Sequence, residues 1–185
     1  MSNLAALKTR LTDFARARLA MARSNPLFAQ GAAVFAAVIV LDQLTKLWVL
    51  KGLNFVPGQS LGLSPYFDIT YVQNRGVSFG ILGSGDARWP LTVFSVVVTA
   101  AILTFLAGAK RPIAAIGLAL IAGGAFGNAI DRALYGYVVD FLNFSGLWFP
   151  WVFNIADAGI NVGVGAILLD TLLEGREKPA EGEDL

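Results

Sequence analysis

The chain has 185 residues, 56% of them hydrophobic, and a mean hydropathy of +0.63. Soluble globular domains are usually about 45–50% apolar, so this composition indicates a membrane protein, and the length fits a single domain. The formal net charge is +1, and no basic stripe with interleaved aromatic residues is present. We therefore expect no nucleic-acid partner.

The sequence contains neither cysteine nor histidine, which narrows the possible chemistry. A cysteine nucleophile, a Ser-His pair and a zinc site built from Cys or His are all excluded. The side chains left for acid–base chemistry are those of Asp, Glu, Lys and Tyr. We expect no metal centre and no cofactor.

Residues 1–26 form a basic N-terminal extension. It carries one acid, Asp13, against five basic residues: Lys8, Arg10, Arg16, Arg18 and Arg23. Apolar residues recur in it at helical spacing, at Leu4, Leu7, Leu11 and Phe14. Two interpretations are open: an amphipathic helix on a membrane surface, or a solvated and partly ordered cytoplasmic tail.

Four long apolar runs follow, at residues 27–50, 89–109, 112–130 and 156–173. Each is about the length that a membrane-spanning helix needs, and the first is too long for a signal peptide. We expect an all-α membrane protein with four transmembrane helices in one domain, 27–173, and a disordered cytoplasmic tail, 174–185. Gly123 and Gly127 stand four apart in the third run, which allows close approach of another helix.

The connection between the first two runs, residues 51–87, is rich in turn signals. Residues 66–72 (YFDITYV) have the aromatic and β-branched composition of a strand, and a second short run follows at 77–82. We expect a small sheet or hairpin outside the membrane. Asn74, close to Gly76, is either a turn residue or an amide that binds an extended peptide.

Lysine and arginine residues at the ends of the runs predict the orientation. The N-terminal extension, the 110–111 turn and the C-terminal tail share one side of a four-span chain and hold five, two and two basic residues. The connections on the other side hold Lys51, Arg75, Arg88 and Arg132. We therefore expect both termini in the cytoplasm, and the sheet and the 133–155 loop on the periplasmic face.

Asp42 and Lys46 lie in the second half of the first run. They stand four apart, so they share one face of a helix and can form an ion pair. A carboxylate at this depth needs such a partner, and we interpret the pair as structural rather than catalytic.

Three aspartates, Asp131, Asp140 and Asp157, lie between residues 123 and 157. Carboxylates are costly at membrane depth and mark functional sites. Asp157 alone is also compatible with a structural cap, because a carboxylate in the first turn of a helix is favoured by the helix dipole. The 133–155 loop, however, returns from the end of one helix to the start of the next. Asp140 can therefore fold back onto Asp157.

Two carboxylates that share one proton can activate water without histidine or metal. One acts as a general base on water and the other as a general acid toward the carbonyl, because repulsion between the like charges separates their pKa values. From the residues alone, catalysis by such a pair and conduction of protons or ions are equally open.

Five short blocks together resemble the lipoprotein signal peptidase family (signal peptidase II). They are DQLTK (42–46), QNRGVSFG (73–80), GGAFGNAIDR (123–132), VVDF (138–141) and FNIAD (153–157). They stand in the family's order and extend from the first apolar run to the fourth. The resemblance implies an intramembrane aspartic endopeptidase of the bacterial inner membrane. Its substrates would be diacylglyceryl-modified prolipoproteins, cut just before the lipidated lipobox cysteine to release the signal peptide.

The resemblance also implies roles for single residues. Asp140 and Asp157 would be the catalytic dyad. The residues that would bind substrate or orient the dyad are Asn74, Asn128, Arg132 and Asn154. Those that would support the structure are Asp42, Lys46 and Asp131. Besides the lipid-modified substrate and membrane lipids, the implied partners are cyclic peptide antibiotics such as globomycin, bound in the same cleft.

The aromatic segment 144–153 (FSGLWFPWVF) has two readings. It can clamp a substrate peptide from above, or it can serve only as an interfacial anchor.

Three rival functions deserve comparison. A proton channel or small transporter would use the acids as a relay, but the acids gather at one end of the spans. A Ser-Lys peptidase would use Lys46 with Ser78 or Ser60, which no spacing brings together. A non-catalytic scaffold would not need several Asn and Asp residues at one membrane face.

Overall fold

The computed structural model describes residues 2–76 and 87–177. Four of its helices are long and apolar enough to cross a membrane. They are α2 (Pro26–Leu47, continued by a π-helical turn, η1, Trp48–Gly52), α3 (Arg88–Ala107), α4 (Pro112–Tyr135) and α5 (Ile155–Glu177). The prediction of a four-helix membrane protein is confirmed.

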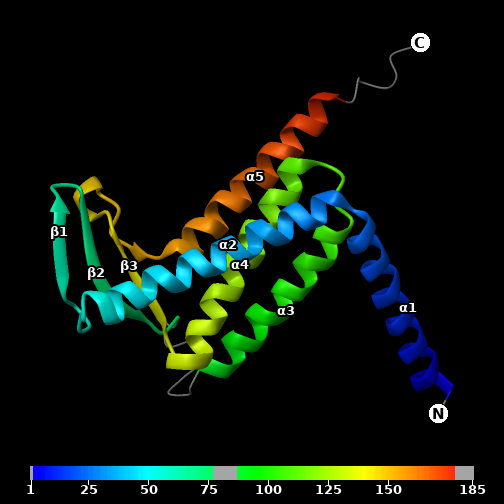
Figure 1. Ribbon diagram of the computed structural model, residues 1–185, viewed down its shortest axis with the longest axis horizontal. Coiled ribbons are helices and arrows are strands. Elements are labelled where there is room, and N and C mark those ends of the chain that lie inside the picture. Colours follow the sequence, from blue (N-terminus) through cyan, green and yellow to red (C-terminus); the bar gives the residue numbers. More distant parts are fainter. Residues whose placement is uncertain (1, 77–86, 178–185) are drawn as a thin grey trace, which may run out of the picture.

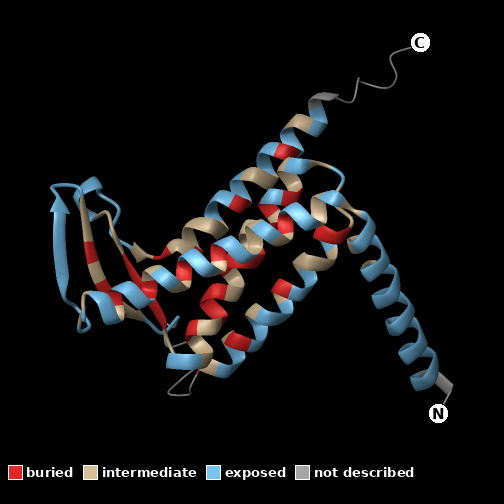
Figure 2. Ribbon diagram, in the orientation of Figure 1, coloured by how far each residue is buried: buried red, intermediate tan, exposed pale blue. Residues whose placement is uncertain are grey.

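Helix α4 occupies the centre of the bundle (Figures 1 and 2). Half of the residues in its most apolar stretch are buried. In the corresponding stretches of the other three spans the share is 17–22%, and their outer faces remain exposed. Such exposed apolar faces suit contact with lipid. α4 also runs five residues beyond the predicted end at residue 130 and stops at Gly136, whose φ of +80° ends the helix in the left-handed conformation.

Glycines on α4 set how closely its neighbours approach. A methyl group at Gly123 would lie 3.0 Å from the carbonyl oxygen of Phe35 on α2, and one at Gly124 would overlap the carbonyl of Ala156 on α5. At Gly127 it would lie 2.8 Å from Oδ2 of Asp42. The close approach predicted from Gly123 and Gly127 is therefore confirmed, and it brings α2 and α5 against the polar end of α4.

A four-stranded antiparallel sheet lies at one end of the bundle, in the order β1-β2-β3-β4 (Figure 1). Its strands are β1 (Ser60–Ser64), β2 (Phe67–Asn74), β3 (Val138–Asn143) and β4 (Val152–Phe153). The predicted strand at 66–72 is present as β2, while the predicted run at 77–82 lies outside the described residues. The partners of β2 are β1 and β3, so the sheet joins segments from two different interhelical connections.

The sheet is fastened to the end of α2 by an apolar cluster. Val49 of the π-helical turn packs with Ile69 and Tyr71 of β2 and with Val139 and Phe141 of β3, and all five are buried. This packing fixes the sheet over the bundle. The register then places Asp140 opposite Val72.

Helix α1 (Ser2–Ser24) leaves the opposite end of the bundle and runs across the direction of the spans (Figure 1). The N-terminal extension is thus helical. Asn25 forms its junction with α2, because its side chain accepts from Leu27 N at 3.0 Å and donates to the carbonyls of Ala107 and Ala109 at the end of α3.

Candidate active site

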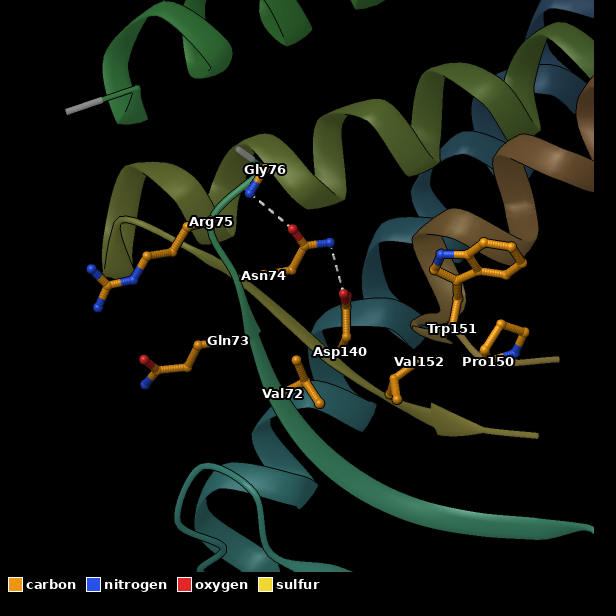
Figure 3. A pocket seen from close by; sticks show the side chains of 9 residues that line it. All are labelled: Val72, Gln73, Asn74, Arg75, Gly76, Asp140, Pro150, Trp151 and Val152. Atoms are coloured by element: carbon orange, nitrogen blue, oxygen red, sulfur yellow. Dashed lines mark hydrogen bonds between the residues drawn. The ribbon is translucent and has the colours of Figure 1, made fainter. Parts of the chain in front are cut away.

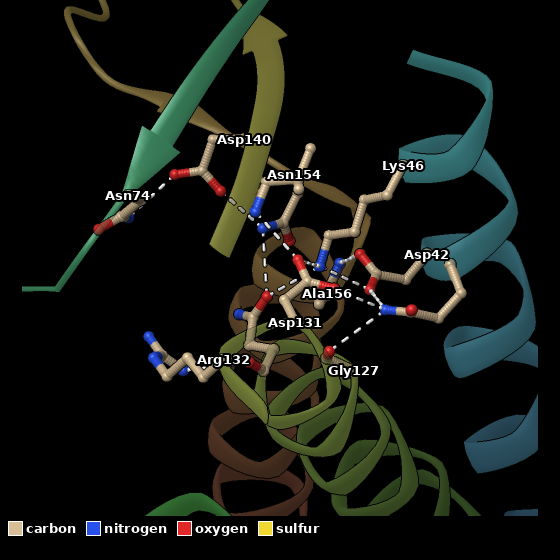
Figure 4. A network of polar contacts seen from close by, with 12 residues as sticks. Asp42, Lys46, Asn74, Gly127, Asp131, Arg132, Asp140, Asn154 and Ala156 are labelled. Atoms are coloured by element: carbon tan, nitrogen blue, oxygen red, sulfur yellow. Dashed lines mark hydrogen bonds and ion pairs between the residues drawn. The ribbon is translucent and has the colours of Figure 1, made fainter. Parts of the chain in front are cut away.

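Residues from five elements converge where the sheet meets the bundle (Figure 4). The polar residues expected at the site are Asp42 and Lys46 on α2, Asn74 on β2, Asn128, Asp131 and Arg132 on α4, Asp140 on β3, Asn154 just before α5 and Asp157 in its first turn. The hydrogen bonds and ion pairs described below connect eight of them, and Arg132 lies beside these eight.

Asp140 is 1% exposed and is held by two amides. Asn74 Nδ2 donates to its Oδ2 at 2.9 Å, and Asn154 Nδ2 donates to its Oδ1 at 2.7 Å. Asn74 is itself oriented by Gly76 N, which donates to Asn74 Oδ1 at 2.9 Å. Asn74 is therefore both a turn residue and a partner of the carboxylate.

Asp157 is held by the local geometry of the helix start and by α4. Its backbone N–H donates to Asn154 Oδ1 at 2.9 Å, and Asn154 N donates back to its Oδ2 at 3.3 Å, a reciprocal cap of the first turn. Asn128 Nδ2 donates to its Oδ1 at 2.8 Å. Asp157 therefore caps the start of α5 and also belongs to the polar network.

Asn128 and Asn154 link the two carboxylates. Asn154 Nδ2 donates both to Asp140 and, at 3.2 Å, to Asn128 Oδ1, while Asn128 donates to Asp157. Two buried amides therefore hold both acids in one hydrogen-bonded chain.

Behind this chain lies a buried ion cluster. Lys46 Nζ is 2.7 Å from Asp42 and 2.9 Å from Asp131, and it donates to Asn128 Oδ1 at 3.1 Å. Both carboxylates also accept backbone hydrogen bonds, from Ala156 N to Asp42 and from Val139 N to Asp131, each at 2.9 Å. Such satisfied pairing is what buried charges require.

Gln43 completes the cluster, and the sequence reading overlooked it. Its amide donates to Asp42 at 3.1 Å and to Asp131 at 3.0 Å. Its place between Asp42 and Lys46 in DQLTK could have suggested that it belongs to the cluster. Only the packing of α4 against α2, however, shows that its side chain turns toward Asp131.

Arg132 lies beside the network rather than within it. Its Nη1 is 3.5 Å from the carbonyl oxygen of Asn128, and its buried Nε has no hydrogen-bond partner among the described residues. A methyl group on Gly76 would lie 3.8 Å from its Nη2. The guanidinium is therefore close to the segment that follows β2.

A cavity of about 370 Å³ opens directly onto Asp140 (Figure 3). One wall is the end of β2 and the residues after it, Val72 to Gly76, and the other is Pro150, Trp151 and Val152. The aromatic segment thus contributes to the rim, although Trp151 is 66% exposed and Trp148 is 96% exposed.

Burial raises the pKa of the Asp140 carboxyl to about 7, and the nearby charge of Asp157 acts in the same direction. Hydrogen bonds from Asn74 and Asn154 oppose the shift. A carboxyl group with this pKa can hold or release a proton near neutral pH, as acid–base catalysis requires. Within the described residues, no group of three or more acidic side chains is arranged to hold a metal ion.

Comparison with known proteins assigns the family. The family model described as signal peptidase (SPase) II matches residues 34–173. The chain belongs to the signal peptidase II family. It is 50% identical over 148 residues to a lipoprotein signal peptidase of Caulobacter vibrioides, covering 79% of this chain and 88% of that protein. It is 40% identical over 156 residues to one of Methylorubrum extorquens, covering 83% and 91%.

Two of the solved structures that match share the fold of this chain. Both are described as bacterial membrane enzyme structures determined by the in meso method. The first has a TM-score of 0.72 at 26% identity and covers 84% of this chain and 94% of that chain. The second has a TM-score of 0.68 at 30% identity and covers 78% and 94%.

Two of the rival functions, the Ser-Lys peptidase and the proton relay, can be compared with this geometry. Lys46 is engaged by two carboxylates, and the hydroxyl of Ser60 pairs with that of Thr70 at 2.6 Å on the exposed sheet. Ser78 lies outside the described residues. A relay would need acids along the bilayer, but the next buried acid on α5 after Asp157 is Asp170, which pairs with Arg111 at 2.9 Å.

Proposed function

We propose that Asp140 and Asp157 are the catalytic dyad of this signal peptidase II. The observation that carries the proposal is the hydrogen-bonded chain from Asp140 through Asn154 and Asn128 to Asp157, with a cavity open at Asp140. It supplies two oriented carboxylates, one of them with a pKa raised to about 7. These are the elements of water activation by an acid pair.

In the proposed reaction, ionised Asp157 takes a proton from water, whose oxygen attacks the scissile carbonyl carbon. Protonated Asp140 gives its proton to the carbonyl oxygen, forming a tetrahedral diol. Asp157 then returns its proton to the amide nitrogen, the C–N bond breaks, and Asp140 recovers a proton from the collapsing diol. The products are the signal peptide acid and an amine on the lipidated cysteine.

We infer that the substrate peptide enters in extended form between the end of β2 and the 150–152 segment. Asn74 and Arg132 would bind its backbone, and the buried Nε of Arg132, which has no hydrogen-bond partner among the described residues, supports this role. The exposed apolar faces of the spans leave room for the diacylglyceryl chains in lipid while the scissile bond reaches Asp140. Cyclic peptide antibiotics such as globomycin would compete for the same cavity.

We also infer that the chain lies in the bacterial inner membrane with both termini cytoplasmic and the dyad near the periplasmic face. The distribution of Lys and Arg supports this orientation. Trp151, at the cavity rim, would then lie at the periplasmic surface of the inner membrane, where an amphipathic ring is favoured.

The test is cleavage of a synthetic prolipoprotein in detergent, with and without diacylglyceryl on its cysteine. We expect the wild-type chain to cleave only the lipidated peptide, and Asp140→Asn and Asp157→Asn to be inactive but folded, because the pair acts as a unit. Asp68→Asn, on the neighbouring strand β2, is the matched control and should remain active.

Rapid turnover by either dyad variant would exclude the dyad. A folded wild-type chain that cleaves neither peptide would instead favour the relay, which proton flux into liposomes would measure.

A further inference from the structure

Helix α1 lies outside the 34–173 region matched by the family model, and the proposed peptidase reaction gives it no role. Its side chains are almost all exposed, and it stands at the end of the bundle opposite the sheet (Figure 2). The helix nevertheless has a distinct arrangement of apolar and basic residues.

One face of α1 is a continuous exposed apolar row. Leu4, Leu7, Leu11 and Phe14 follow each other at intervals of three and four residues, and each is at least 52% exposed. Residues at this spacing lie on the same side of a helix. Such a row in water is unfavourable and marks a surface that something covers.

Phe14, at one end of the apolar row, reaches the flank of the bundle. A groove of about 380 Å³ lies between α1 and α3, lined by Phe14, Leu19 and Ala22 of α1 and by Phe28, Leu103 and Ala107. Residues of both helices line this groove, so the apolar surface continues from α1 onto a membrane span. Since α1 also runs across the spans, lipid around α3 would meet this same face (Figure 1).

The charge on α1 is complementary to anionic lipid. Of the five basic residues, Arg16 forms an ion pair with Asp13 at 3.9 Å, and that is the only salt bridge of α1 in the part of the chain that the structure describes. Among the described residues that line the groove, Arg18 carries a charge. Its guanidinium lies over the Phe14 ring at 5.3 Å, and a methyl group on Gly108 would come within 3.0 Å of its Nη1.

We propose that α1 is an interfacial helix that binds anionic phospholipid. The apolar row enters the acyl-chain region, and Arg18 binds a lipid phosphate above the groove between α1 and α3. Basic residues near an anionic leaflet add electrostatic attraction to apolar burial. An acidic soluble protein would match the charge, but it would not match an apolar face that is continuous with a membrane span.

The absence of native cysteine allows a direct test, because one introduced cysteine can carry a nitroxide label. We would label Leu11→Cys, on the apolar row, and Thr9→Cys, on the opposite face, in the full chain. Each would be placed in nanodiscs holding one copy, made of phosphatidylcholine alone or of equal parts phosphatidylcholine and phosphatidylglycerol. Collision with oxygen reports lipid, and collision with a water-soluble nickel complex reports solvent.

In the phosphatidylglycerol discs, we expect the oxygen-to-nickel accessibility ratio at residue 11 to exceed that at residue 9 several-fold. The difference should shrink in phosphatidylcholine alone, at high salt and with Arg18→Gln, but not with Arg16→Gln, the matched control. Peptidase activity in detergent should be unchanged in the Arg18→Gln variant, because α1 is remote from Asp140 and Asp157.

Three results would overturn the proposal. Equal nickel accessibility of both labels in the phosphatidylglycerol discs would show a solvated helix. Equal protection of residue 11 in both lipid compositions would show burial without anionic selectivity. Protection that appears only in discs with two copies, or only after an acidic protein is added, would identify a protein partner instead of lipid.

Discussion

At the scale of single residues, the donors and acceptors of the network fix which way each amide side chain points. The Lys46 ammonium can only donate, so the oxygen of the Asn128 amide must face it, and the nitrogen of the amide is left to donate to Asp157. Asn154 is oriented in the same way, because its oxygen accepts from Asp157 N and its nitrogen donates to Asp140. Each amide therefore presents its N–H groups to a carboxylate.

Replacing Asn154 by aspartate should disable the peptidase. The substitution Asn154→Asp keeps the shape but turns the donor to Asp140 into an acceptor, and it adds a negative charge beside two others. We expect kcat to fall about 100-fold or more, since misplacement of a catalytic group has effects of this size.

The matched control for this substitution is Asn161→Asp on the exposed face of α5, where the amide donates to the backbone carbonyl of Asp157. Steady-state cleavage of a lipidated peptide measures both variants. Comparable kcat values for the two would remove Asn154 from the site.

The raised pKa of Asp140 predicts how activity depends on pH. If Asp140 is the general acid, it must be protonated, so kcat/KM should fall as the pH rises through about 7. A rate that stays constant between pH 6 and about 8 would assign the acid role elsewhere.

The same shift affects stability. Because the folded-state pKa lies above the ordinary value of 3.8, folding is favoured by protonation, and this contribution is lost as the pH rises from about 4 through about 7. The Tm of Asp140→Asn in detergent should therefore change less over this range than the wild-type Tm.

At the scale of elements, the buried ion cluster joins three helices and a strand. Lys46 and Asp42 come from α2 and Asp131 comes from α4, while the backbone donors are Ala156 of α5 and Val139 of β3. The cluster thus holds the elements that carry Asp140 and Asp157.

Removing one partner from this cluster should destabilise the fold. In Asp42→Asn, Lys46 loses its nearest carboxylate while remaining buried, and breaking a buried pair in this way costs about 3–5 kcal/mol. We expect a clear fall in Tm and a smaller effect on the kcat of the folded fraction.

Asp13→Asn, which breaks the exposed pair on α1, is the control and should leave Tm nearly unchanged. An Asp42→Asn protein with normal melting but no turnover would make Asp42 part of the reaction rather than of the scaffold.

The elements also differ in how well local sequence predicts them. The four spans follow from long apolar runs, and β2 follows from its aromatic and β-branched residues. β1 carries a glycine and two serines, and β4 has two residues, so neither has a clear local pattern. Both strands exist because β2 and β3, which are distant in sequence, provide edges for them to pair with.

At the scale of the whole molecule, the two ends of the bundle differ in composition. The sheet lies at one end, and α1 and the turn between α3 and α4 lie at the other (Figure 1). In the proposed orientation, these two ends of the molecule therefore face opposite sides of the membrane.

A single cysteine should therefore react from only one side of the membrane. In right-side-out spheroplasts, a membrane-impermeant maleimide should label Tyr66→Cys, between β1 and β2, without permeabilisation. It should label Lys110→Cys, in the turn between α3 and α4, only after permeabilisation. Both native residues are exposed, so access to the reagent is not limited by burial. The reverse pattern would invert the proposed topology.

The sequence by itself determined the number of spans, singled out Asp140 and Asp157 as candidates for an acid pair, and pointed to the family. It could do so because apolar runs of membrane length and charged residues within them are strong local signals. Tertiary structure alone decided that Asn128 and Asn154 join the two acids, that Gln43 completes the ion cluster, and that β3 pairs with β2. These contacts link residues that are far apart in the chain, and their geometry arises only when the glycines of α4 let α2 and α5 approach closely.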